Sequence, residues 1–166
     1  MKKQCRRKVW ALVNPITHAI EGAAIITDDV IQGLRTRELS AIEAFHKNRA
    51  GLQEWCDLVA LMNVAEHMAF NGVGPEAKPT LHEAHGHLIA AANRYESTKK
   101  MGLTGPGLNC MREMYEWHDL QRKSISRTEY NKHIKSTVNR IKSKAPEVTD
   151  VMDVAAGLRL FAGAKA

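Results

Sequence analysis

Apolar residues recur every three or four positions along most of this chain, which is the spacing of an α-helix with one buried face. Several segments carry this pattern, and each is bounded by residues typical of helix ends. The predicted helices run from a start at Thr27 with Asp28 and Asp29 to before Gly51, from about Leu52 to Phe70, from Thr80 to about Glu96, from about Leu108 to the join at Gln121, and from Ser126 to before Pro146. We therefore predict an all-α, single-domain helical bundle of about five main helices.

Two capping boxes mark the helix starts most clearly. Thr80 is followed three residues later by Glu83, and Ser126 is followed in the same way by Glu129. In this motif the hydroxyl accepts a hydrogen bond from the third helical amide, and the carboxylate accepts one from the amide of the cap residue. The last helix is the most regular of the set, and we expect one buried stripe along it, formed by Tyr130, Ile134, Val138 and Ile141.

The two ends of the chain carry weaker patterns. Val9 to Val13 is a short strand-like run, and Asn14-Pro15 opens a short helix through about Ile25. The segment 149–166 has no helix start signal, so it is either a docked terminal helix or a partly ordered tail. The predicted organisation is a bundle domain over residues 1–148 with a basic N-terminal arm, followed by this tail.

Composition narrows the class of protein. The chain has 166 residues, of which 44% are apolar, and its formal net charge is +6. This composition allows one packed core and a surface that attracts phosphates or an acidic protein face. No apolar run is long enough to span a bilayer, so we expect no membrane partner. Cys5, Cys56 and Cys110 are odd in number and widely spaced, which favours free thiols in a reducing compartment and so a cytoplasmic location.

The last predicted helix is strongly basic. Its cationic residues, with Glu129 as the only acid, are Arg127, Lys132, Lys135, Arg140, Lys142 and Lys144. A second basic cluster at the N-terminus includes Arg6, Arg7 and Lys8. Such a helix can lie against a phosphate backbone, although a solvated outer face of a bundle has the same pattern. The short join from Gln121 to Ser126 also resembles helix-turn-helix spacing, although many antiparallel helix pairs have a similar join.

The hypothesis of an enzymatic function has less support. His82, His85 and His87 lie close together with Glu83, but their spacing misses the zinc-protease motif by one residue. Two arginine–histidine pairs six residues apart, Arg112 with His118 and Arg127 with His133, loosely resemble the motif of helical ribonucleases of the HEPN type. Because basic residues and histidines are abundant, such pairs arise by coincidence, and His118 fits a core position. We expect no catalytic residue, no metal ligand and no cofactor.

Two stretches carry a resemblance to a known group of proteins. Cys5 to Ile16 and Met101 to Gly107 resemble segments of small uncharacterised proteins encoded by phages and prophages of proteobacteria. The resemblance covers about the first quarter of the chain and one loop, and it brings no active site. It implies a small protein that binds host nucleic-acid machinery or blocks host defence, including CRISPR systems.

The sequence therefore favours a non-enzymatic binding protein whose basic helix meets nucleic acid or an acidic protein surface. The main alternative is an inhibitor of a host protein, with Trp10, Trp55, Trp117 and the methionines as candidate anchors, although most of these fit core positions. A metal-dependent or HEPN-like enzyme is the remaining alternative, and self-association stays open.

Overall fold

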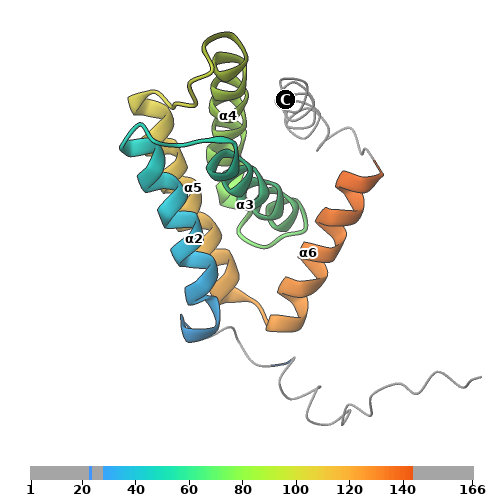
Figure 1. Cartoon of the computed structure of the whole chain (residues 1–166). Coiled ribbons are helices and arrows are strands. Elements are labelled where there is room, and N and C mark those ends of the chain that lie inside the picture. The colour runs from blue at the N-terminus through green and yellow to red at the C-terminus, as the bar shows by residue number, and fades with distance from the viewer. Residues whose placement is uncertain (1–22, 24–27, 144–166) are drawn as a thin grey trace, which may run out of the picture.

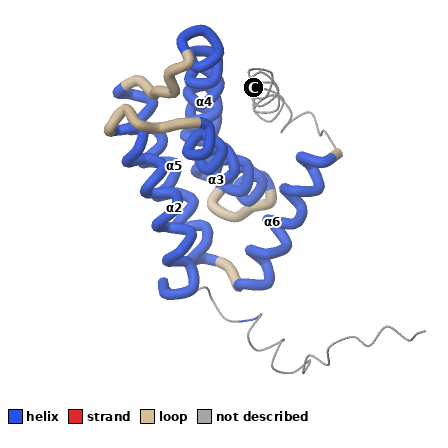
Figure 2. The backbone as a smooth tube through the Cα atoms, in the orientation of Figure 1, coloured by secondary structure: helices blue, strands red, loops and turns tan. Residues whose placement is uncertain are grey.

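The computed structural model describes residue 23 and residues 28–143, and this part of the chain is a bundle of α-helices joined by short loops (Figure 1). Its helices are α2 (Asp28–His46), α3 (Leu52–Phe70), α4 (Lys78–Thr98), α5 (Gly105–Ser124) and α6 (Arg127–Lys142), with the short 3-10 helix η1 (Pro75–Ala77) before α4. Figure 2 shows no strand among these residues. The all-α bundle is confirmed. The strand-like run at Val9, the short helix after Pro15, the basic N-terminal arm and the tail 149–166 lie outside the described residues.

Helix α3 is the centre of the bundle. It packs against α2, α4, α5 and α6, whereas α2 also contacts α5, and α4 also contacts α5 (Figure 1). Its buried side chains include Trp55, Leu58 and Met62, and the Trp55 indole N–H donates to the Leu88 carbonyl of α4 at 2.9 Å. A tryptophan that buries both its ring and its hydrogen bond fixes the position of α4 on α3. Trp55 is therefore a core residue and not a surface anchor.

Local signals place most helix ends correctly. The predicted bounds of α3 are those of the structure, and α2 ends before Gly51 as expected. At the start of α6 the Glu129 amide donates to Ser126 Oγ at 3.3 Å, and the Ser126 amide donates to Glu129 Oε2 at 3.0 Å. The second predicted capping box is thus confirmed, because both of its bonds are local and need no tertiary partner.

The predicted capping box at Thr80 is wrong. Helix α4 begins at Lys78, directly after η1, and Pro79 lies in its first turn, where a residue without an amide donor fits well. Thr80 is therefore inside the helix, and its hydroxyl donates to Glu113 Oε1 of α5 at 2.8 Å. Similarly, α5 begins at Gly105, inside the predicted glycine-rich break, because the Thr104 hydroxyl caps it by accepting from the Gly107 amide at 3.2 Å.

A turn with two glycines connects α3 to η1, and Gln121 of α5 holds it in place. Gly72 and Gly74 both have positive φ, at 88° and 61°, which glycine adopts without strain. Gly74 also lies against Gln121, and a Cβ atom there would meet Gln121 Cγ at 3.0 Å. The buried Gln121 amide donates to the carbonyls of Ala65 and Val73 at 3.2 and 2.8 Å. This side chain ties the end of α5 to the end of α3.

The buried face of α6 differs from the predicted stripe. Tyr130 and Thr137 are buried, and Ile134 packs beside Tyr130 in a small cluster with Ile31 and Met68. Val138, expected in this stripe, is 40% exposed. The difference arises because α6 contacts α3 along the line through Tyr130 and Thr137, which are seven residues apart. Val138 lies to one side of this line and faces solvent.

This register gives different predictions for two neighbouring apolar residues. Ile134→Asp is expected to lower the free energy of unfolding by about 1–3 kcal/mol, because it places a carboxylate in the apolar contact with α3. Val138→Asp is expected to change it by less than about 0.5 kcal/mol, since this side chain faces solvent and Val and Asp have similar helix propensities. Chemical denaturation followed by circular dichroism measures both values. Equal losses in the two variants would contradict the register.

Candidate nucleic-acid interface

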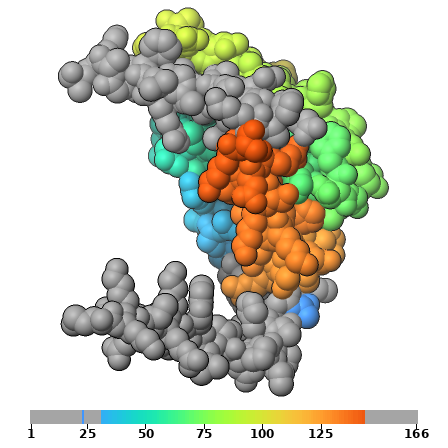
Figure 3. Space-filling view, turned by 90° about the vertical axis from the view of Figure 1, so that its right-hand side faces the viewer, coloured from blue at the N-terminus to red at the C-terminus, as the bar shows by residue number. Residues whose placement is uncertain are grey.

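Helix α6 lies at the edge of the bundle with one side on α3. It follows α5 after the residues Ile125 and Ser126, and its docked side carries Tyr130 and Thr137. Figure 3 looks onto this helix, drawn in orange. On the opposite side lie four exposed cationic residues, which we call the basic face of α6: Arg127, Lys132, Lys135 and Lys142.

The basic face is continuous because of helical geometry. At about 3.6 residues per turn, its four residues fall within less than half of the helix circumference. The exposed amides Asn131 and Asn139 share this sector and add hydrogen-bonding groups to it. Cations and amides on one side of a helix are the groups that proteins use to contact phosphate oxygens.

Among residues 28–143, none of the four cations of the basic face forms an ion pair with a carboxylate. The one acid of the helix, Glu129, is occupied at the cap, and hydrogen bonds from the Ser126 backbone and side chain lower the pKa of its carboxyl group. This carboxylate sits at the positive end of the helix dipole, where it stabilises the helix start.

Arg140 does not belong to the basic face. Its Nη1 lies 3.0 Å from His67 Nδ1 of α3, so this predicted contact residue helps to dock α6 on the bundle. His133 faces the same place, with its ring 5.3 Å from that of His67 in an edge-on arrangement. Burial lowers the pKa of both histidines, and the Arg140 charge lowers that of His67 further. Of the other predicted contact residues, Arg6, Arg7, Lys8 and Lys144 lie outside the described residues.

A second basic surface lies at the other end of α5. The α2–α3 and α4–α5 loops enclose a depression of about 700 Å³ whose charged residues are all cationic: Arg49, Arg94, Lys99 and Lys100. Arg94 also donates to the Gly102 carbonyl at 2.9 Å. The twenty residues of α5 separate this surface from the start of α6 by about 30 Å. The sequence gives little sign of it, because Arg49 lies far along the chain from the other three.

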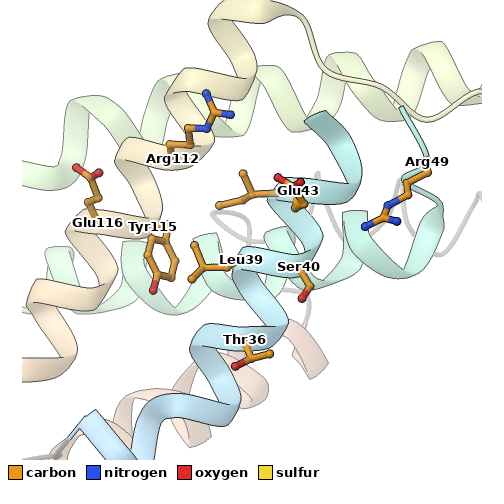
Figure 4. A pocket seen from close by; sticks show the side chains of 9 residues that line it. Thr36, Leu39, Ser40, Glu43, Arg49, Arg112, Tyr115 and Glu116 are labelled. Carbon is orange, nitrogen blue, oxygen red and sulfur yellow. The ribbon is translucent and has the colours of Figure 1, made fainter. Parts of the chain in front are cut away.

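A groove between α2 and α5 differs from both basic surfaces. It has a volume of about 630 Å³, and Leu39 and Tyr115 line it (Figure 4). Its charged residues are of both signs, with Arg49 and Arg112 beside Glu43 and Glu116. A polyanion entering this groove would meet two carboxylates, so the groove suits nucleic acid less well than the basic face does.

A buried ion pair and a partly buried one join α2 to α5, and the sequence pattern does not reveal either of them. Arg122 is fully buried and donates to both carboxylate oxygens of Glu38, at 3.0 and 2.8 Å. Arg35 donates to both oxygens of Asp119, at 2.8 and 2.7 Å. Burial raises the pKa of Glu38 against the opposing effect of Arg122. Burial also disfavours ionised Asp119, but hydrogen bonds from Arg35 and Lys123 outweigh it and lower the pKa to about 2.

The two arginine–histidine pairs do not converge on a common site. His118 is buried, with its ring nitrogens 3.3 Å from Gln121 Oε1 and 3.2 Å from the Tyr130 hydroxyl. Burial lowers its pKa to about 3, so the ring is neutral at physiological pH. Arg112 instead lines the exposed groove. In the second pair, Arg127 is exposed whereas His133 turns toward His67. The interpretation of His118 as a core histidine is confirmed.

Comparison with known proteins identifies no relative of this chain. No protein-family model, curated protein or solved structure matches the chain. Within residues 28–143, no helix combines the length and the apolar content that a bilayer crossing requires.

Proposed function

We propose that this protein is a non-enzymatic nucleic-acid-binding protein that uses the basic face of α6 against the phosphate backbone. The observation that supports this proposal is the set of four exposed cations on one side of an edge helix, none of which forms an ion pair within the described part of the chain. An edge helix can approach a nucleic acid without interference from the rest of the bundle. The resemblance to phage proteins supports a target in the host cell, either nucleic acid itself or the machinery that handles it.

The dimensions of the basic face suit a backbone contact. Arg127 and Lys142 are fifteen residues apart, which corresponds to about 23 Å along the helix axis. One strand of duplex DNA presents a phosphate about every 3.4 Å along its axis, so the face spans several phosphates. Each cation that neutralises a phosphate releases counterions, and affinity then falls as salt concentration rises. Because these contacts carry no base readout, the expected binding is largely independent of sequence.

The test is to replace the three lysines of the basic face with glutamine. The variant Lys132→Gln/Lys135→Gln/Lys142→Gln should keep its helicity, since Gln and Lys have similar helix propensities. Fluorescence anisotropy with labelled duplex DNA should show affinity reduced by on the order of a hundredfold at about 0.1 M salt. The slope of log affinity against log salt should flatten by about 2.7. Arg140 is left unchanged because its loss would loosen α6 from α3.

The matched control removes the same charge elsewhere. Lys78, Lys99 and Lys100 are exposed lysines on α4 or directly after it that, like those of the basic face, form no ion pair among the described residues, and their replacement with glutamine also lowers the net charge by three. This control should retain most of the affinity and of the salt slope. Equal losses in both variants would show that only net charge matters and would overturn the assignment to α6. Absence of binding to duplex DNA, single-stranded DNA and RNA would overturn the function, as would a lysate partner that is a protein and survives nuclease treatment.

A further inference from the structure

Three side chains with metal-binding atoms meet where α4 packs on α5. Glu83 and His87 are four residues apart on α4, and Glu83 Oε1 lies 3.3 Å from His87 Nε2. Cys110 reaches the same place from α5, and one oxygen, nitrogen and sulfur atom of the three residues all lie within 4.8 Å of one another. Among residues 28–143, this is the one group of three histidine, cysteine or carboxylate side chains close enough together to hold a metal ion. Its ligand atoms come from two helices, and Cys110 is more than twenty residues away from His87 in sequence.

We propose that Glu83, His87 and Cys110 form a binding site for a divalent transition metal of the zinc class. Thiolate, imidazole and carboxylate are the three ligand types that zinc takes in proteins, usually in tetrahedral geometry. A sulfur ligand disfavours magnesium and calcium, which prefer oxygen. Three protein ligands leave one position for water, so the site is open on one side. The proposal is independent of the nucleic-acid contact at α6.

The backbone leaves room for the histidine at this site. Gly107 is buried one turn before Cys110, and a Cβ atom there would lie only 3.1 Å from His87 Nδ1. The glycine therefore lets the imidazole ring pack against α5 and keeps it near Cys110. Spacing of four residues places Glu83 on the same side of α4 as His87, since such residues are neighbours on the helix surface. The ring therefore contacts Glu83 on its own helix and lies against Gly107 of α5.

Access from solvent and the nearby carboxylates suit a cation at this cluster. Cys110 is only 5% exposed, whereas Glu83 is exposed, so an ion can enter from solvent and meet the sulfur at the inner end. Glu113 lies nearby on α5, where its Oε1 accepts from the Thr80 hydroxyl. Without a metal, burial raises the pKa of the Cys110 thiol to about 11, with the charges of Glu83 and Glu113 acting in the same direction, so the thiol is protonated and a metal has to displace its proton. On metal binding the thiol releases its proton to solvent and the sulfur becomes a thiolate ligand.

The neighbouring histidines are not part of this site. The sequence directs attention to His82, His85 and His87 as one group, but the structure brings only His87 together with Glu83 and Cys110. His82 is exposed, and one face of a helix cannot present all three histidines to one ion. The partner that completes the cluster is a cysteine on the next helix, which sequence spacing does not reveal.

Cobalt is the probe that tests the sulfur ligand directly. The full-length protein, stripped of metal with a chelator, is titrated with Co²⁺ and followed by absorption spectroscopy, and then with Zn²⁺ by calorimetry. We expect one ion per chain, a thiolate-to-cobalt charge-transfer band, and a Tm raised by about 5 °C or more when zinc is in hundredfold excess over its Kd. Absence of the band, or no saturable binding of either ion, would overturn the proposal.

Variants assign the ligands. Cys110→Ser should abolish the charge-transfer band, and His87→Gln and Glu83→Gln should each weaken zinc binding at least tenfold. The latter two lie nearer the surface, so they keep the test valid if Cys110→Ser fails to fold. Matched controls are His82→Gln and Cys56→Ser, which replace the same residue types outside the cluster. Loss of binding in a control, or full zinc affinity in both His87→Gln and Glu83→Gln, would overturn the assignment.

Discussion

Replacing Arg122 with methionine is expected to lower the free energy of unfolding by about 3–5 kcal/mol, because it leaves charge buried without its partner. The Arg122 guanidinium is fully buried and holds both carboxylate oxygens of Glu38, and its Nη2 also lies 3.4 Å from Asp119 Oδ1. Methionine fills part of the volume but offers no donor. Glu38, which is 8% exposed, would then have to remain charged in a poorly solvated place or take up a proton. Urea denaturation at neutral pH measures the loss.

A double variant distinguishes the missing partner from a general packing defect. Glu38→Met/Arg122→Met removes both charges, and such replacements in other proteins are often close to neutral in stability. We expect it to recover most of the loss seen in Arg122→Met. Arg37→Gln is the surface control, because the exposed ion pair of Arg37 with Asp57 should contribute less than about 1 kcal/mol. If Arg122→Met proves as stable as Arg37→Gln, the buried pair does not hold α2 to α5.

Mild acid is expected to destabilise the bundle through His118. Its folded-state pKa is about 3 and its ordinary value is 6.5, so below about pH 6.5 the unfolded chain takes up a proton that the folded one refuses. Burial is the main cause, and the Arg122 charge adds to it. The contribution of His118 to the free energy of unfolding is therefore fully present above about pH 6.5. It falls toward pH 3 by about 1.36 kcal/mol per pH unit. Between pH 7 and pH 5 the protonation of this residue alone should lower the free energy of unfolding by about 2 kcal/mol.

The measurement is the free energy of unfolding as a function of pH, compared with His118→Gln. The variant keeps a polar side chain near Gln121 and Tyr130 but removes the titrating ring, so its curve should be flatter between pH 5 and pH 7. Some slope should persist, because His67 and His133 also have lowered pKa values. The raised pKa of Glu38 acts in the opposite direction, and the comparison of the two proteins cancels it. Parallel curves would contradict this role of His118.

Sequence alone was sufficient for features that depend on neighbouring residues. Helix period, the glycine and asparagine that end α3, and the Ser126–Glu129 capping box all act within a few residues of chain, so the pattern predicts the bundle and most helix bounds. The basic character of α6 is likewise visible in the sequence, and the structure adds which of its cations face solvent. Four of them do, whereas Arg140 contacts His67.

Tertiary structure decided every feature that needs a partner from another helix. Thr80 lost its predicted role as a cap because η1 and Pro79 start α4 earlier and Glu113 offers its hydroxyl another acceptor. Val138 faces solvent because α3 contacts α6 along a different line than the apolar pattern indicates.

The buried pair of Glu38 with Arg122, and the meeting of His87 with Cys110, involve residues far apart in sequence. Helical periodicity fixes which side of its own helix a residue occupies, but it says nothing of the rotation and height at which two helices pack. That packing is set by side-chain shape across the interface, and it alone determined which charges, rings and sulfur atoms came together in this bundle.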